Sequence, residues 1–200
     1  MVKIGDKAFR EVALIDAEYT ARAGEHVKVI CIVVKLLCKG EVHRLWLDGV
    51  CKLKTFPVPF DRDVLFVCYS ALAELSAIQS LGLPPFVSIL DLFAEYRVLT
   101  NERISPGKTG LLSACEFFGV STITASYKHD NRAIAIRGSP FTDEERASLL
   151  DYCQEDVEAL ERLLPTCCRT STLAVLSSGA SACARLHVSS TPGSRSMSRC

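Results

Sequence analysis

The sequence predicts an α/β fold in which a mixed β-sheet is flanked by α-helices. Segments with strand-like patterns cluster in the first half of the chain, and helical segments dominate the part that follows. Hydrophobic residues make up 48% of the 200 residues, which is enough for the core of one ordinary domain. Early strands with helices interleaved later are typical of a sheet covered by helices.

The predicted strands are short apolar or alternating segments separated by breakers. The second is a long apolar run, and the third alternates around Trp46. Pro57 and Pro59 separate the third from the fourth. The predicted strands cover residues 12–16, 27–37, 42–47, 64–68 and 87–92.

The clearest predicted helix spans residues 142–164 and closes at Pro165. Thr142 can cap it, and Glu145 stands three residues later in the position of a capping box. Residues 121–138 are polar and mixed, so we expect a loop there with at most one helical turn. The other predicted helices cover residues 71–81, 93–99 and 109–118.

The composition changes sharply after Pro165. Residues 166–200 contain no acidic residue and show no sustained periodicity, so we expect a disordered, low-complexity tail. We therefore divide the chain into one domain over residues 1–165 and a tail over residues 166–200. The abrupt change would also fit a shifted reading frame in the gene.

Charge and cysteine content narrow the classes of site that the chain can hold. The net charge is zero, from 23 basic and 23 acidic residues, so a nucleic-acid role needs a local patch, bound metal ions or another domain. The ten cysteines are irregularly spaced, so we expect buried thiols and no zinc site. The cysteines before the tail, which form no C-x-x-C pair, are Cys31, Cys38, Cys51, Cys68, Cys115 and Cys153.

No segment has the pattern of a signal peptide or a membrane span. The longest apolar run, residues 27–38, is shorter than the roughly 20 residues that cross a bilayer, and Lys28 and Lys35 interrupt it. We therefore expect a soluble, cytoplasmic protein with no membrane partner.

Acidic residues recur at three places where predicted elements begin or end. Asp16 and Glu18 end the first strand, where alternation places both carboxylates on one face and lets them hold the same ion. Glu74 lies where the fourth strand leads into a helix, and its alternative role is that of an exposed helical residue. Tyr152 and Asp156 stand at i and i+4 on one face of the last helix, where a polar surface stripe is the alternative.

Taken in order, these motifs resemble the tyrosine subclass of the DEDD 3′→5′ exonuclease superfamily. Residues 89–97 and 137–142 are similar to the proofreading domain of a phage and bacterial branch of family A DNA polymerases, in which Glu occupies the position of Glu74. The resemblance covers residues 11–165 and implies an RNase H-like sheet. The chain departs from the family in having Ala17 between the first two acids and no Asn-containing turn before Glu74.

The resemblance implies two Mg²⁺ or Mn²⁺ ions as cofactors. Asp16 would bridge both ions, and Glu18 and Asp156 would complete the site of the ion that activates water. Tyr152 would orient that water, and Glu74 would support the second ion. Asp91 is a fallback ligand, although it resembles a structural aspartate after the fifth strand.

The function implied is the removal of nucleotides from the 3′ end of single-stranded DNA. We expect a fragment of a family A DNA polymerase whose polymerase domain is missing from this chain. The alternatives are an RNase D-like enzyme that trims RNA and a catalytically decayed domain that only binds nucleic acid. Possible contacts with the substrate strand are the aromatic Tyr69 and Phe93 and the basic Arg97, Arg103, Lys108, Lys128 and Arg132.

Overall fold

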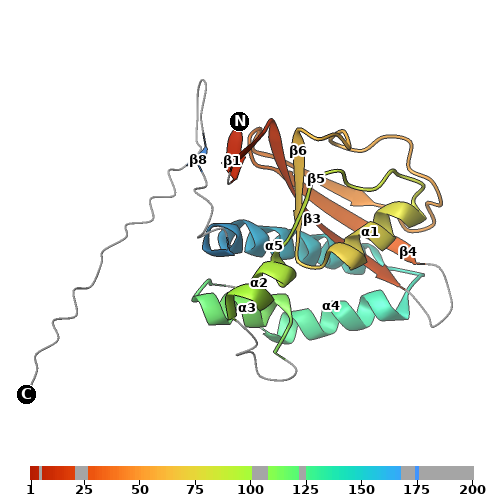
Figure 1. The fold of residues 1–200 in the computed structure, drawn as a ribbon. Helices are drawn as coiled ribbons and strands as arrows, with labels where there is room; N and C mark the ends of the chain where they lie inside the picture. The colour runs from red at the N-terminus through yellow and green to blue at the C-terminus, as the bar shows by residue number, and fades with distance from the viewer. Residues whose placement is uncertain (5, 21–26, 101–107, 122–124, 168–173, 176–200) are drawn as a thin grey trace, which may run out of the picture.

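The computed structural model places a five-stranded mixed sheet between two helical layers (Figure 1). It describes residues 1–4, 6–20, 27–100, 108–121, 125–167 and 174–175. The strands are β1 (Val2–Ile4), β2 (Lys7–Phe9), β3 (Glu11–Thr20), β4 (Lys28–Leu36), β5 (Glu41–Trp46), β6 (Val64–Cys68), β7 (Ile89–Asp91) and β8 (Ala174–Val175). The helices are α1 (Ala71–Ser80), α2 (Leu92–Thr100), α3 (Leu111–Phe118), α4 (Ala125–Arg137) and α5 (Asp143–Cys167).

The main sheet has the strand order β5-β4-β3-β6-β7. Strands β3, β4 and β5 pair antiparallel, whereas β6 and β7 run parallel to β3. The sheet is therefore mixed and helices cover it, as the sequence predicts. A separate small sheet joins β1 to β2 and to β8.

Strand β3 lies at the centre of the sheet and alternates between two apolar layers. Val12 and Leu14 pack in the cluster that includes α5, whereas Ala13 and Ile15 pack in the cluster that includes α1. The period of two follows from the pleat, and it leaves the strand apolar throughout because both faces are covered. Helix α5 crosses the first face, and α2, α3 and α4 pack against α5 (Figure 1).

A register shift in the ladder between β3 and β4 lies beside the end of β3. Glu18 pairs with Cys31 but Tyr19 pairs with Val29, so Ile30 is an extra residue in β4. The bulge lets both Ile30 and Cys31 face the α5 side, where both are buried in the same cluster. Packing against α5 therefore continues across the end of the sheet.

The prediction of a loop over residues 121–138 was wrong, because residues 125–137 form α4. The helix is polar overall, so its sequence lacks a recognisable apolar stripe. Its Asn131 and Ala135 side chains are buried, at 1% and 2% exposure. Packing against α5 and β3 stabilises the helix, as is usual where intrinsic pattern is weak.

Smaller differences concern the two ends of the domain and the thiols. The sequence did not predict the hairpin of β1 and β2, and α5 runs two residues past Pro165 because Leu164 and Cys167 are buried in the core. Cys38 and Cys51 are exposed, so the expectation of buried thiols fails for these two. The predicted tail lies outside the described residues apart from the end of α5 and strand β8, and the domain boundary stays a prediction.

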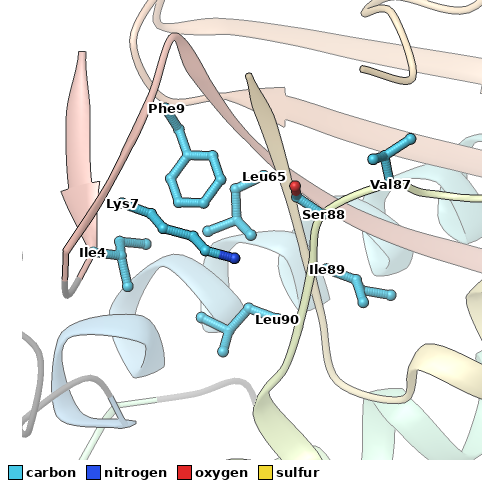
Figure 2. A pocket seen from close by; sticks show the side chains of 8 residues that line it. All are labelled: Ile4, Lys7, Phe9, Leu65, Val87, Ser88, Ile89 and Leu90. Carbon is cyan, nitrogen blue, oxygen red and sulfur yellow. The ribbon is translucent and has the colours of Figure 1, made fainter. Parts of the chain in front are cut away.

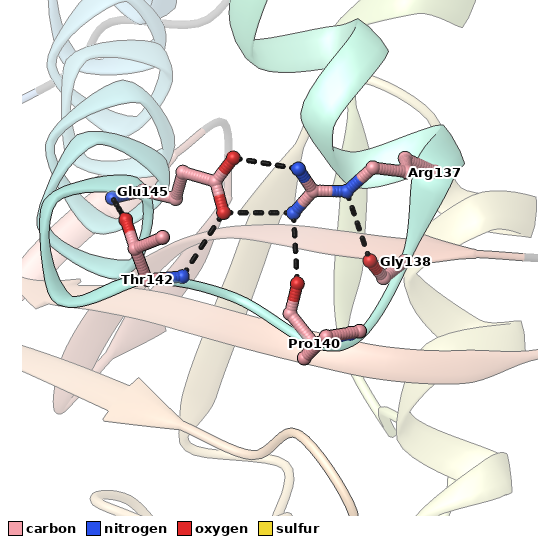
Figure 3. Close-up of polar contacts among 5 residues, drawn as sticks. All are labelled: Arg137, Gly138, Pro140, Thr142 and Glu145. Atoms are coloured by element: carbon pink, nitrogen blue, oxygen red, sulfur yellow. Dashed lines mark hydrogen bonds and ion pairs between the residues drawn. The ribbon is translucent and has the colours of Figure 1, made fainter.

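The capping box predicted at Thr142 is present (Figure 3). The backbone N–H of Glu145 donates to Thr142 Oγ1 at 3.2 Å, and the N–H of Thr142 donates to Glu145 Oε2 at 3.0 Å. Arg137, the last residue of α4, donates to both carboxylate oxygens of Glu145 at 2.7 Å. Arg137 lowers the pKa of Glu145 to about 2, and the amide of Thr142 adds to that effect. The start of α5 is therefore tied to the end of α4.

We expect Thr142→Ala to lower the free energy of unfolding by about 1 kcal/mol, because the N–H of Glu145 then loses its capping oxygen. Urea denaturation followed by circular dichroism measures the change. Thr55→Ala is the matched control, because Thr55 is exposed outside any helix or strand and should change stability by less than about 0.5 kcal/mol. Equal midpoints for the two variants would contradict a stabilising cap.

Candidate active site

Asp16 and Glu18 lie near the carboxyl end of β3 and are both half-buried. Strands β3 and β6 are parallel, so their carboxyl ends meet at the same edge of the sheet. Alternation from Leu14, which faces α5, places both carboxylates on the α5 side of the strand. Helix α1 begins at this edge because it follows β6 directly.

Glu74 lies in the first turn of α1 and is only 5% exposed. Burial raises the pKa of its carboxyl well above the ordinary value, and the charges of Asp16 and Glu18 raise it further. A hydrogen bond from the Ala17 amide lowers the pKa of Glu74, whereas the charge of Asp156 raises it. Glu74 is therefore part of the same acidic group, and the alternative of an exposed helical residue is wrong.

Helix α5 brings Tyr152 and Asp156 to the same edge, at 8% and 7% exposure. Burial raises the pKa of the Tyr152 phenol, and the charges of Asp156, Glu18 and Asp16 raise it further, in that order. The phenol therefore stays protonated at neutral pH. The alternative of a polar surface stripe is wrong, because both side chains are buried.

The structure thus brings together side chains from β3, α1 and α5 that are far apart in the sequence. The buried Oε2 atom of Glu74 accepts no hydrogen bond, which is a costly state for a carboxylate oxygen unless a cation or proton occupies the site. Oxygen ligands of this kind suit Mg²⁺ or Mn²⁺. Within the described residues, however, no three Asp, Glu, His or Cys side chains are arranged to hold a metal ion.

Tyr19 belongs to this group but was not among the predicted site residues. It is half-buried on the α1 face of β3, where it packs beside Ala17. Burial raises the pKa of its phenol, and Glu74, Glu18 and Asp16 raise it further. Its position directly after Glu18 was the available signal, but that signal becomes informative only when α1 is known to carry Glu74 to the same face.

Asp91, the fallback ligand, has a structural role. Its Oδ2 accepts the N–H of Ala71 at 3.0 Å, and its Oδ1 accepts the N–H groups of Phe93 and Ala94 at 2.9 and 3.4 Å. Both oxygens therefore satisfy backbone groups at the starts of α1 and α2. Asp91 orients the helix that carries Glu74.

A buried thiol links α5 directly to β3. The Sγ of Cys153 donates to the backbone carbonyl of Asp16 at 3.1 Å, and the Sγ of Cys31 lies 3.9 Å from the carbonyl of Leu149. Burial raises the pKa of the Cys153 thiol, so it remains a neutral donor. This contact joins the part of α5 that carries Tyr152 and Asp156 to Asp16 of β3.

Figure 2 shows a hollow of the structure, whose volume is about 350 Å³. It is lined by the β1–β2 hairpin and by the amino ends of β6 and β7, whereas the acidic group lies at the carboxyl ends of β3 and β6. The two features therefore lie at opposite ends of the parallel strands. The lining residues are Ile4, Lys7, Phe9, Leu65, Val87, Ser88, Ile89 and Leu90.

No protein-family model matches the chain, and no curated protein matches it in sequence. Solved structures do match its fold. The apo form of a nuclease superposes with a TM-score of 0.56 at 11% identity, over 80% of this chain and 72% of that one. NrnC from Brucella melitensis gives a TM-score of 0.56 at 15% identity, over 82% and 75%. The same protein with bound Mg²⁺ gives 0.50 at 14% identity, over 83% and 80%.

The architecture is therefore the RNase H-like exonuclease fold, which confirms the predicted fold class. The similarity to the nuclease and to NrnC holds at sequence identities of only 11% to 15%. Likeness at this identity establishes the fold and not the reaction. Among the described residues, no helix combines the length and apolarity required to cross a membrane.

We expect Glu74→Gln to raise the free energy of unfolding of the metal-free protein at neutral pH, by about 1–3 kcal/mol. The pKa of Glu74 is raised in the folded state, so above the ordinary value of 4.5 the folded protein binds more protons than the unfolded chain. The free energy of unfolding therefore decreases as the pH rises above 4.5. Glu74→Gln has no carboxylate to ionise and should not show this decrease. Urea titrations in EDTA near pH 5 and near pH 8 measure it.

Glu116→Gln is the matched control for this substitution, because Glu116 is exposed on α3. The control should show the same pH dependence as the unmodified protein. If Glu74→Gln also kept that dependence unchanged, the buried carboxylate would not be a source of strain in the folded protein.

Proposed function

We propose that this chain is a metal-dependent 3′→5′ exonuclease that hydrolyses the terminal phosphodiester bond of single-stranded DNA. The observation that carries the proposal is the electrostatic coupling of Asp16, Glu18, Glu74 and Asp156 at one edge of the sheet. The fold shared with nucleases supports it. Carboxylates from separate elements at one place are the ligand set that two-metal phosphodiester hydrolysis requires.

In this proposal Asp16, Glu18, Glu74 and Asp156 hold two Mg²⁺ or Mn²⁺ ions. Asp16 would contribute to both ion sites, Glu18 and Asp156 to the site of the ion that activates water, and Glu74 to the other. The bound ions would lower the pKa of the attacking water and neutralise charge on the phosphate and the leaving 3′-oxygen. The raised pKa of Glu74 supports this assignment, because a nearby cation would offset the repulsion that raises it.

Tyr152 orients the attacking water. Its phenol stays protonated because burial and three carboxylates raise its pKa, so it acts as a hydrogen-bond partner and not as a base. The thiol of Cys153 and the turn of helix between Tyr152 and Asp156 keep the phenol and the carboxylate on the same side of β3. Positioning of this kind supplies rate by orientation.

The substrate and the biological context rest on the sequence resemblance. The connector over residues 137–142 and the segment over residues 89–97 are similar to family A polymerase proofreading domains. We therefore propose DNA as the substrate and a fragment of such a polymerase as the context. Hydrolysis of matched DNA and RNA oligonucleotides tests the first point, because a 2′-hydroxyl contact would favour RNA.

We expect Asp156→Asn to lower kcat for nucleotide release by at least about a thousandfold, because it removes a charged ligand of the ion that activates water. Release of nucleotides from a 5′-labelled oligonucleotide, with Mg²⁺ or Mn²⁺ added, measures the rate. Addition of EDTA should abolish the reaction in the unmodified protein, and excess metal should restore it.

Asp151→Asn is the matched control on the same helix. Asp151 is half-exposed and pairs with Arg44 at 2.6 Å, so its loss should leave the rate within about threefold of the unmodified protein. Absence of nucleotide release from the unmodified chain with either metal would replace the proposal by a decayed domain. Equal losses in Asp156→Asn and Asp151→Asn would contradict the specific role of Asp156.

We expect Tyr152→Phe to lower kcat by about tenfold to a hundredfold with little change in KM, because one hydrogen bond to the water is lost while the ligands stay. Steady-state rates at saturating Mg²⁺ measure both constants. The rate of Tyr152→Phe should keep the pH profile of the unmodified protein up to about pH 9, since the phenol does not ionise in this range. A changed profile would mean that Tyr152 acts as an acid or base.

A further inference from the structure

Helix α4 is fixed against the edge of the sheet that carries the carboxylates. The Oγ of Ser148 in α5 donates to Oδ1 of the buried Asn131 in α4 at 2.8 Å. This bond turns the Asn131 side of α4 toward α5. Gly138, which follows α4, packs against the end of β3, since a Cβ there would lie 3.6 Å from Cγ2 of Thr20. The carboxyl end of α4 therefore lies beside Thr20, the last residue of β3, which directly follows Tyr19.

Arg132 follows Asn131 directly and is exposed. Its charge lowers the pKa of both Tyr19 and Tyr152, opposing the carboxylates that raise them. The neighbouring Asn131 bonds to Ser148, which lies one helical turn before Tyr152 on α5, and α4 also packs against β3. This packing places Arg132 beside the edge of the sheet that carries the carboxylates. Within the described part of the chain no carboxylate forms an ion pair with Arg132, so its hydrogen-bonding fork remains open to a ligand.

The other basic residues that the sequence offers for the substrate strand are placed differently. Arg97 lies over the ring of Phe93, with 5.8 Å between its Cζ and the ring centroid. Lys108 lies 3.9 Å from the carboxylate of Glu116. Arg103 and the side chain of Lys128 lie outside the described residues. Of the three whose side chains the structure describes, Arg132 is the cation on the helix that packs against the end of β3.

We propose that Arg132 binds a backbone phosphate of the substrate strand at the rim of the acidic site. An arginine fork matches phosphate geometry, and a phosphate contact is independent of base sequence. This contact would also offset the repulsion between a polyanionic strand and the carboxylates, which a chain of zero net charge does not offset globally. The inference rests on the proposed nuclease function and names how that site receives its substrate.

The test is the salt dependence of oligothymidylate binding, measured by fluorescence anisotropy between about 50 and 200 mM NaCl with Mg²⁺ present. Arg132→Gln, Arg132→Lys and Arg62→Gln are compared with their parent, all in an Asp156→Asn background that keeps the oligonucleotide intact. Arg62 is the matched control because it is exposed, lacks an ion pair among the described residues and precedes the amino end of β6. The slope of log K against log salt counts the phosphates contacted.

We expect Arg132→Gln to make the slope shallower by about 0.7, the value for one contact on a single strand. Arg132→Lys should keep the slope, and Arg62→Gln should leave it unchanged. An unchanged slope in Arg132→Gln overturns the inference, as does an equal loss in Arg62→Gln. Nucleotide release by the unmodified chain is assayed separately, so failure of the nuclease proposal is recognised independently of the slope.

Discussion

Repulsion among carboxylates is the constraint on which the described site depends. Glu74 is buried beside Asp16 and Glu18, with Asp156 also in reach, and each charge raises the pKa of Glu74. Two like charges at close range in a partly dry site cost several kcal/mol, so apolar packing elsewhere must hold them together. The sheet and its two helical layers provide that packing, and the site lies where the packing ends.

Helix α5 makes several of the contacts that stabilise this arrangement. Its first turn is tied to α4 by the Thr142, Glu145 and Arg137 network, and its centre is tied to β3 by the thiol of Cys153. Near its carboxyl end, Glu161 accepts from Lys35 of β4 at 2.6 Å. These contacts tie the start, the centre and the carboxyl end of α5 to α4, β3 and β4, and they support the position of Tyr152 and Asp156 beside Asp16.

The two faces of the sheet contribute different parts of the site. The α5 face supplies the half-buried Asp16 and Glu18, and the α1 face supplies the buried Glu74 with the half-buried Tyr19. Asp91 orients α1 by accepting the N–H of Ala71, so the carboxylate of Asp91 serves backbone groups. Asp91 lies near the acidic group but its oxygens accept backbone N–H groups, whereas Oε2 of Glu74 accepts no hydrogen bond. An oxygen without a backbone donor is therefore stronger evidence of function than closeness to the acidic group.

The sequence by itself determined the elements whose reason is local. The alternation of Asp16 and Glu18, the i and i+4 spacing of Tyr152 and Asp156 and the capping box at Thr142 all depend on neighbours along the chain. Strand β6 was predicted with its observed bounds for the same reason. These patterns, with a resemblance to a known superfamily, were enough to predict the fold class.

Only the tertiary structure decided which residues share the site and which do not. Helix α4 escaped prediction because contacts with α5 and β3 stabilise it and no apolar stripe marks it. The burial of Glu74, the place of Tyr19 on the same face and the position of Arg132 at the rim all follow from how distant elements pack. Desolvation and charge coupling act through space, so no spacing along the chain can encode them.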